Sequence, residues 1–169
     1  MMILAVWRWG NWRNWQNYYP TMLYISSLNL LYNLLCSNFM LWEYQPVWLL
    51  DTHPHNIDLG YTFIFLPSLA LLFLSNLPEK KPNLSKLAYF FMWTTLSILW
   101  ELAHYSLKGI KYDHGWTIFY SYAFYWIMYP TLLLHFKKPL YAILLSIPII
   151  IFLLWHFKVP FHLAPLKRS

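Results

Sequence analysis

The feature that most constrains the fold is segment 84–108, LSKLAYFFMWTTLSILWELAHYSLK, an apolar stretch long enough to cross a lipid bilayer. It nevertheless carries Glu101 and His104 near its C-terminal end. Ionisable side chains in a membrane-spanning helix must be satisfied inside the protein or in a water-filled recess. The segment therefore predicts a central helix of a membrane bundle. We expect its polar stripe of Thr94, Ser97, Glu101 and His104 to pack against the polar face of the first span, segment 21–42, or to line a recess.

The composition agrees with a protein that lies in lipid. Hydrophobic residues make up 59% of the chain and charged residues 11%, whereas soluble domains carry about 25% charged residues. The 12 Lys and Arg exceed the 6 Asp and Glu, but they are scattered between apolar runs, so we expect contact with membrane lipids and no nucleic-acid partner. The single cysteine, Cys36, excludes an intrachain disulfide.

Four further apolar segments, 21–42, 59–77, 116–136 and 140–157, predict additional spans. We therefore expect an all-α, polytopic membrane helix bundle with about five spanning helices, formed as one unit by residues 20–169. Residues 1–19 place Trp and Tyr opposite Arg13, Asn14 and Asn17, a pattern typical of a helix lying in the membrane interface. Pro67 predicts a kink in the second span.

Three polar residues of the first span, Ser26, Asn29 and Asn33, share one face. This stripe predicts contact with other helices, because an asparagine amide facing lipid would be left unpaired.

The distribution of Lys and Arg predicts the orientation of the bundle. Loop 43–58 carries none, whereas the turn at 79–81 has two adjacent lysines, so we expect the N-terminus in the cytoplasm. Five spans would bring loop 43–58, the end of segment 84–108, loop 109–115 and the C-terminal tail to one side, together with most of the acids and histidines. His135, at the opposite end, is expected only to mark the membrane interface.

Several motifs resemble a family of small multi-pass membrane proteins from endospore-forming Gram-positive bacteria. They are WGNWRNWQNYYPTMLY (9–24), LLYNLL (30–35), LWEY (41–44) and WELAHYSLKGIKYDHGW (100–116). The resemblance implies a bacterial plasma-membrane location, and it implies no activity, cofactor or functional residue.

Glu101 and His104 leave three interpretations open. The first is an internal ion pair between them, which needs no cofactor. The second is a site for zinc or another divalent metal, with ligands drawn from His53, His55, Glu101, His104, Asp113 and His114. The third is a pocket in which Glu101 and His104 relay protons or bind a cationic solute.

Three functions correspond to these interpretations. The leading hypothesis is a non-enzymatic, structural or accessory integral membrane protein whose partners are lipids and other membrane proteins, because the sequence lacks a catalytic motif such as HExxH. The alternative is a metal-dependent membrane enzyme acting on a lipid or isoprenoid at the outer leaflet. The third is a small proton-coupled transporter, so whether the protein is an enzyme stays open.

The predicted topology can be tested by cysteine labelling on a Cys36→Ser background. Thr52→Cys, in the loop without basic residues, should react with a membrane-impermeant maleimide from outside. Lys81→Cys should react only after the membrane is permeabilised, because a basic loop is expected on the cytoplasmic side. Labelling of both cysteines from the same side would contradict the topology.

Overall fold

The computed structural model describes residues 2–46 and 54–160, without the side chains of Pro54 and His55. Most of this part of the chain is helical, which confirms the all-α prediction. Its elements are α1 (Met2–Trp9), the 3₁₀-helix η1 (Trp12–Asn17), α2 (Tyr19–Leu35), α3 (Pro54–Gly60), the π-helical turn η2 (Tyr61–Phe65), α4 (Leu66–Ser75), α5 (Asn83–Ser106), α6 (Ile118–Lys137) and α7 (Pro139–His156). Two short strands, β1 (Trp42–Tyr44) and β2 (Ile110–Tyr112), complete it.

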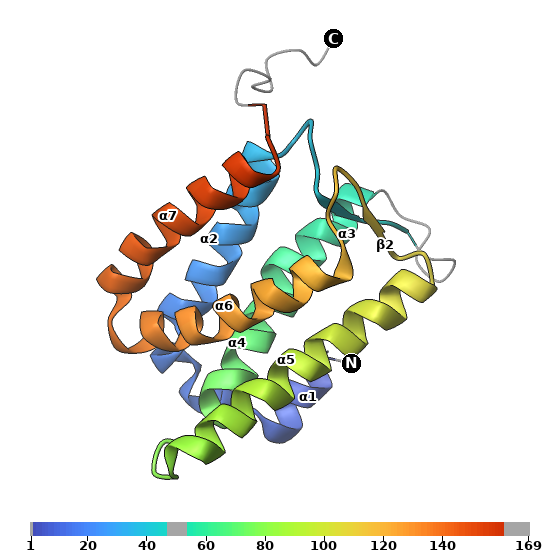
Figure 1. Ribbon diagram of the computed structural model, residues 1–169. Helices are drawn as coiled ribbons and strands as arrows, with labels where there is room; N and C mark the ends of the chain where they lie inside the picture. The colour runs from blue at the N-terminus through green and yellow to red at the C-terminus, as the bar shows by residue number, and fades with distance from the viewer. Residues whose placement is uncertain (1, 47–53, 161–169) are drawn as a thin grey trace.

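The long helices pack in a bundle in which α6 holds the centre. It lies between α5 and α7 in Figure 1 and also contacts α2 and α4, while α2 packs closely on α4. The buried core joins these helices through Phe73 of α4 and Tyr129 and Leu132 of α6. The large ring of Tyr129 is fully buried and its hydroxyl bonds Ser97 of α5, at 2.5 Å.

The first long helix is shorter than the predicted span 21–42, because α2 ends at Leu35. The Tyr32 hydroxyl accepts hydrogen bonds from the backbone N–H groups of Leu41 and Trp42, each at 2.9 Å, and donates one to the Trp42 carbonyl at 2.8 Å. These bonds replace those that further helix would make, so the chain folds back over the last turn of α2.

Loops 43–58 and 109–115, which the sequence predicts as irregular, contain a two-stranded antiparallel sheet. Strands β1 and β2 pair with Glu43 opposite Lys111, and Trp42 opposite Tyr112. The pairing brings residues 42–44 and 110–112 together at one end of the bundle. At the other end, Lys137 lies 3.2 Å from Glu79, which brings together the α4–α5 and α6–α7 connections.

Pro67 is accompanied by a π-helical turn rather than a simple kink. Leu66 donates its N–H to the Tyr61 carbonyl, five residues back, and Pro67 has no N–H to continue the pattern to Thr62. The Ser26 hydroxyl of α2 donates to the Thr62 carbonyl at 2.7 Å instead. A neighbouring helix thus satisfies the carbonyl that proline leaves free.

The aromatic N-terminus is not one helix. It breaks between α1 and η1 at Gly10, where a side-chain Cβ would lie 2.8 Å from Leu71 Cδ2 of α4. Low helix propensity at Gly10 and Asn11 and the close approach of α4 explain the break. The side chains of Trp7 and Trp9 remain about two-thirds exposed, at 67% and 66%.

His135 lies inside the bundle, whereas the sequence interpretation placed it at the membrane interface. Its Nδ1 is 3.0 Å from the Thr21 hydroxyl, and its ring stacks on Tyr24 with 4.1 Å between centroids. The Tyr24 hydroxyl in turn bonds Ser146 of α7. The interaction of α2, α6 and α7 through these side chains explains why a histidine here is buried.

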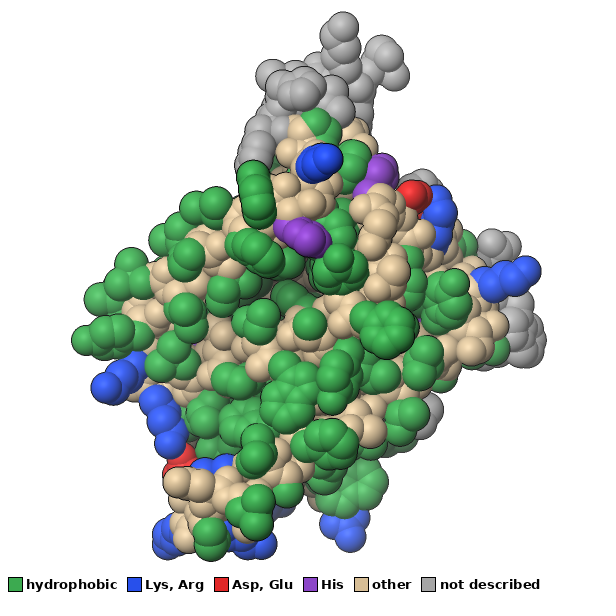
Figure 2. Space-filling model, in the orientation of Figure 1, with side chains coloured by type: hydrophobic (Ala, Val, Ile, Leu, Met, Phe, Trp, Pro, Cys, Tyr) green, Lys and Arg blue, Asp and Glu red, His purple; other side chains and the backbone are tan. Residues whose placement is uncertain are grey.

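Two described helical stretches are long and apolar enough to cross a membrane, Asn56–Ser75 with 20 residues and Pro139–His156 with 18. Figure 2 shows a belt of hydrophobic side chains across this face, with Lys, Arg, Asp and Glu gathered at opposite ends of the helices. Only 17% of the α7 stretch is buried, whereas the core helix of a soluble protein would be mostly covered.

The pairing of β1 with β2 can be tested with a cross-link. Glu43→Cys and Lys111→Cys, on a Cys36→Ser background, should form a disulfide under mild oxidation, because directly opposed residues place their Cα atoms about 4.5–5.5 Å apart. A gel-shift assay with a polymer-linked maleimide measures the loss of free thiols. The control pair Glu43→Cys with Lys81→Cys should stay reduced, and two free thiols in the test pair would refute the pairing.

Candidate ligand cavity around Glu101

The polar stripe of α5 faces into the bundle. Thr94, Ser97 and Glu101 recur at helical spacing, and all three are buried. Their neighbour is α6, through Tyr129, Tyr125 and Ser121, rather than the polar stripe of α2 that was one of the two expected surroundings. The α2 stripe packs instead on the α3–η2 segment, where Asn29 bonds the Thr62 hydroxyl at 2.8 Å and Asn33 bonds Asp58.

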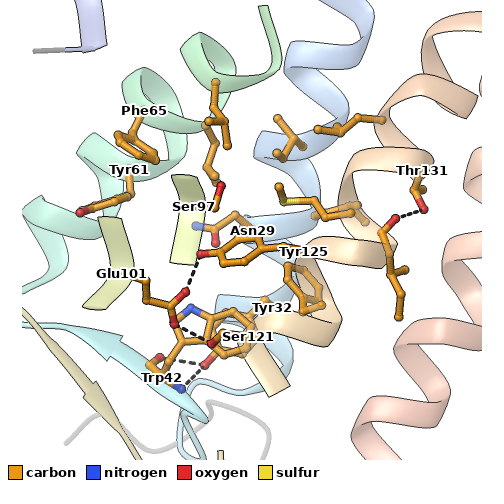
Figure 3. Close-up of a pocket in the computed structure, with 18 of the residues that line it drawn as sticks. Asn29, Tyr32, Trp42, Tyr61, Phe65, Ser97, Glu101, Ser121, Tyr125 and Thr131 are labelled. Carbon is orange, nitrogen blue, oxygen red and sulfur yellow. Dashed lines mark hydrogen bonds between the residues drawn. The ribbon is translucent and has the colours of Figure 1, made fainter. Parts of the chain in front are cut away.

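The Glu101 carboxylate is held by three hydroxyl groups. Oε1 accepts from Tyr112 of β2 at 2.5 Å. Oε1 also accepts from Ser121 of α6, and Oε2 accepts from Tyr125 of α6, each at 2.6 Å (Figure 3). Trp116 Nε1 donates to Ser121 at 2.9 Å and orients it. Burial and the bond to Glu101 raise the pKa of Tyr112, which keeps its hydroxyl a donor.

Glu101 and His104 do not form the ion pair that their spacing suggests. His104 Nδ1 lies 3.0 Å from the Trp100 carbonyl, and its ring contacts Trp100 and Tyr61, at 4.5 Å and 6.1 Å between centroids. Ion pairs in the described part of the chain join Lys111 to Asp113, His114 to Asp113, and Lys137 to Glu79. The Glu101 carboxylate therefore has no cationic partner there.

Of the described candidate metal ligands, Asp113 and His114 lie together, with 3.9 Å between Oδ1 and Nδ1, whereas Glu101 and His104 bond other groups. Asp113 bonds Lys111 at 2.8 Å and the His114 N–H at 2.9 Å, and these contacts hold its pKa below the usual value. His114 Nδ1 is 2.9 Å from the Met40 carbonyl. His53 and the side chain of His55 lie outside the described residues. Among the side chains that the structure describes, no three His, Cys, Asp or Glu are grouped to hold a metal ion.

Beside Glu101 the bundle contains a cavity of about 870 Å³. All the long helices contribute to its wall, which is mostly aliphatic and aromatic; examples are Leu28, Phe65, Leu69, Trp100, Tyr125 and Ile150. Figure 3 shows Glu101 beside Tyr125 and Ser121, with Tyr61 and Phe65 on a neighbouring helix. Among its described lining residues, the cavity thus combines a long apolar wall with one carboxylate, Glu101, near the end that carries the β-sheet.

The sequence interpretation found the carboxylate but not its partners. Ser121 and Tyr125 are four residues apart and therefore share a face of α6, a signal that aromatic residues throughout segment 116–136 obscured. Tyr112 could not be found in this way, because its contact with Glu101 depends on the fold of the loop between α5 and α6.

Removing the carboxylate should destabilise the fold. Glu101→Ala should lower the free energy of unfolding by about 3 kcal/mol or more, because each buried donor left without a partner costs roughly 1–3 kcal/mol. Denaturation in mild detergent, followed by circular dichroism, measures the change. Glu79→Ala removes an exposed, ion-paired carboxylate and should cost less than about 1 kcal/mol. Equal effects of the two changes would show that the hydroxyl contacts contribute little.

Comparison with protein-family models, curated proteins and solved structures gives no match to this chain. The resemblance of the Trp-rich motifs to small bacterial membrane proteins stays an expectation from the sequence. The geometry of the cavity and of Glu101 is what bears on function.

Proposed function

We propose that this chain is a multi-pass protein of the bacterial plasma membrane that binds an amphiphilic molecule inside its helix bundle. In this proposal α2, the α3–η2–α4 segment, α5, α6 and α7 are the five spans, and the N-terminus lies in the cytoplasm. The role is that of a binding or accessory protein rather than an enzyme.

The placement in a membrane is supported by where the apolar side chains lie. Phe91 of α5, Phe119 of α6 and Phe152 of α7 are 54%, 81% and 56% exposed, which would be unfavourable for so many large rings in water. With 24 residues, α5 is about 36 Å long, enough to cross the hydrocarbon core. The exposed tryptophans of the N-terminal segment suit the headgroup layer.

The observation that carries the binding function is the apolar cavity with one buried carboxylate. Its volume of about 870 Å³ is in the range of sites that enclose small molecules. Water gains little in a cavity with few polar partners, whereas an alkyl chain gains contact with the whole wall. A bound amphiphile would place its chain along the helices and its polar head at Glu101.

The proposal can be tested by analysing what co-purifies with the protein. Native mass spectrometry in mild detergent should find an amphiphile bound in a one-to-one ratio. Leu31→Trp should reduce this occupancy, because residue 31 lines the cavity and the larger ring would take up space that the alkyl chain needs. Circular dichroism should show that the variant remains helical.

The matched control is Leu34→Trp, on the same helix at a position that is 60% exposed and away from the cavity. It should keep the bound molecule. The proposal fails if the unaltered protein carries no amphiphile, or if Leu31→Trp carries as much as Leu34→Trp.

A further inference from the structure

We propose that the amphiphile carries a positively charged ammonium head, which binds between the Glu101 carboxylate and the aromatic side chains at that end of the cavity. The inference rests on the proposed function and adds the chemical class of the ligand. It concerns a long-chain organic ammonium compound without an anionic group beside the charge.

The first support is the charge that Glu101 leaves uncompensated. All three of its hydrogen-bond donors are neutral hydroxyls, and the ion pairs within the described residues do not include it. A carboxylate can accept about four hydrogen bonds, so Oε2 keeps one free acceptor position. In surroundings of low dielectric a cation at that position would be strongly attracted.

The second support is the group of aromatic side chains that line the cavity together with Glu101. Tyr61 stacks on Tyr44 with 3.8 Å between centroids, and Phe65 lies 4.9 Å from Tyr61 and 5.7 Å from Trp100. Tyr32 and Trp42, stacked at 3.9 Å, also line the cavity. The faces of such rings attract organic ammonium groups, and a carboxylate adds a full negative charge.

One of the aromatic neighbours, Tyr44, is sensitive to the carboxylate. Burial, Tyr61 and the Glu101 carboxylate together raise the pKa of Tyr44 well above its usual value. Glu101 lies on α5 and Tyr44 on β1, so the carboxylate and this ring approach the cavity from different elements.

This arrangement discriminates among polar heads. An anionic head would be repelled by Glu101 and would find no Lys or Arg among the described residues that line the cavity. A neutral hydroxyl head could donate one hydrogen bond to Oε2 but would gain no charge interaction. A phosphocholine head carries a phosphate close to its ammonium and would lose part of the attraction. An unopposed ammonium is the favoured head.

The experiment compares three amphiphiles with the same chain on the full-length protein in maltoside micelles. They are tetradecyltrimethylammonium, tetradecylphosphocholine and the neutral tetradecyl tri(ethylene glycol) ether, each titrated by calorimetry. The unaltered protein should bind the ammonium compound at least about tenfold more tightly than the neutral one, the size of effect that a desolvated cation–π contact and a charge pair supply. The phosphocholine should fall between them, and if it binds most tightly the site recognises a phospholipid head.

Two variants separate charge from shape. Glu101→Gln should bind the ammonium and neutral compounds within about twofold of each other while still binding the neutral compound, because the cavity wall is unchanged. Trp100→Leu leaves the hydroxyl contacts of Glu101 intact and should reduce the ammonium preference, which keeps the test decisive if Glu101→Gln does not fold. Glu79→Gln, a matched change at the other end of the bundle, should keep the full preference.

The results distinguish the two proposals. Equal binding of the ammonium and neutral compounds to the unaltered protein, or an undiminished preference in Glu101→Gln, would overturn the ammonium head and leave the amphiphile site standing. Absence of binding by all three compounds, together with no co-purified amphiphile, would overturn both.

Discussion

The buried carboxylate of Glu101 is the interaction on which the rest of the architecture depends. A charge inside an apolar bundle is tolerated only when its hydrogen-bonding capacity is used, and hydroxyls from β2 and α6 supply three bonds. These bonds fix α5 against α6 and draw the loop after α5 back over the helix end. That loop contains β2, and the pairing of β2 with β1 holds the first residues of loop 43–58 at the same place. One side chain thus links two helices and both strands.

Contacts of the same kind join other pairs of helices. Ser97 bonds Tyr129, Thr21 lies beside His135, and Ser26 supports the carbonyl that Pro67 frees. If the bundle lies in lipid, apolar packing gives little preference for one neighbour over another, since lipid chains are equally apolar. Hydrogen bonds between buried side chains then decide which helix faces which. In α2 and α5 they recur at helical spacing, at Ser26 and Asn29 and at Ser97 and Glu101, and so mark the side of the helix that packs on its neighbours.

Apolar composition defines the helices, and hydrogen bonds between side chains select their neighbours. This difference explains what could be predicted from the sequence and what could not. The five long helical segments follow from runs of apolar residues, and the burial of Glu101 follows from the cost of exposing it. The partner of each polar stripe depends on which helices are neighbours, and no local pattern encodes that. The strands WEY and IKY are three residues each, too short for an alternation to show, and they pair across more than sixty residues. The His104 ring packs on Trp100 rather than beside the Glu101 carboxylate. The i, i+3 spacing of Glu101 and His104 is compatible with either arrangement.

The position of Glu101 along its helix also fits the cavity to a membrane ligand. Glu101 is five residues before Ser106, the last residue of α5, and therefore about 8 Å from the helix end. In a spanning helix this depth is close to the boundary between hydrocarbon and headgroups. An amphiphile in the cavity would keep its head at the level that it occupies in the surrounding bilayer, so transfer into the protein would not require drawing a charge to the membrane centre. The β1–β2 sheet lies over this end of the bundle, which favours entry between the helices from the lipid rather than from water.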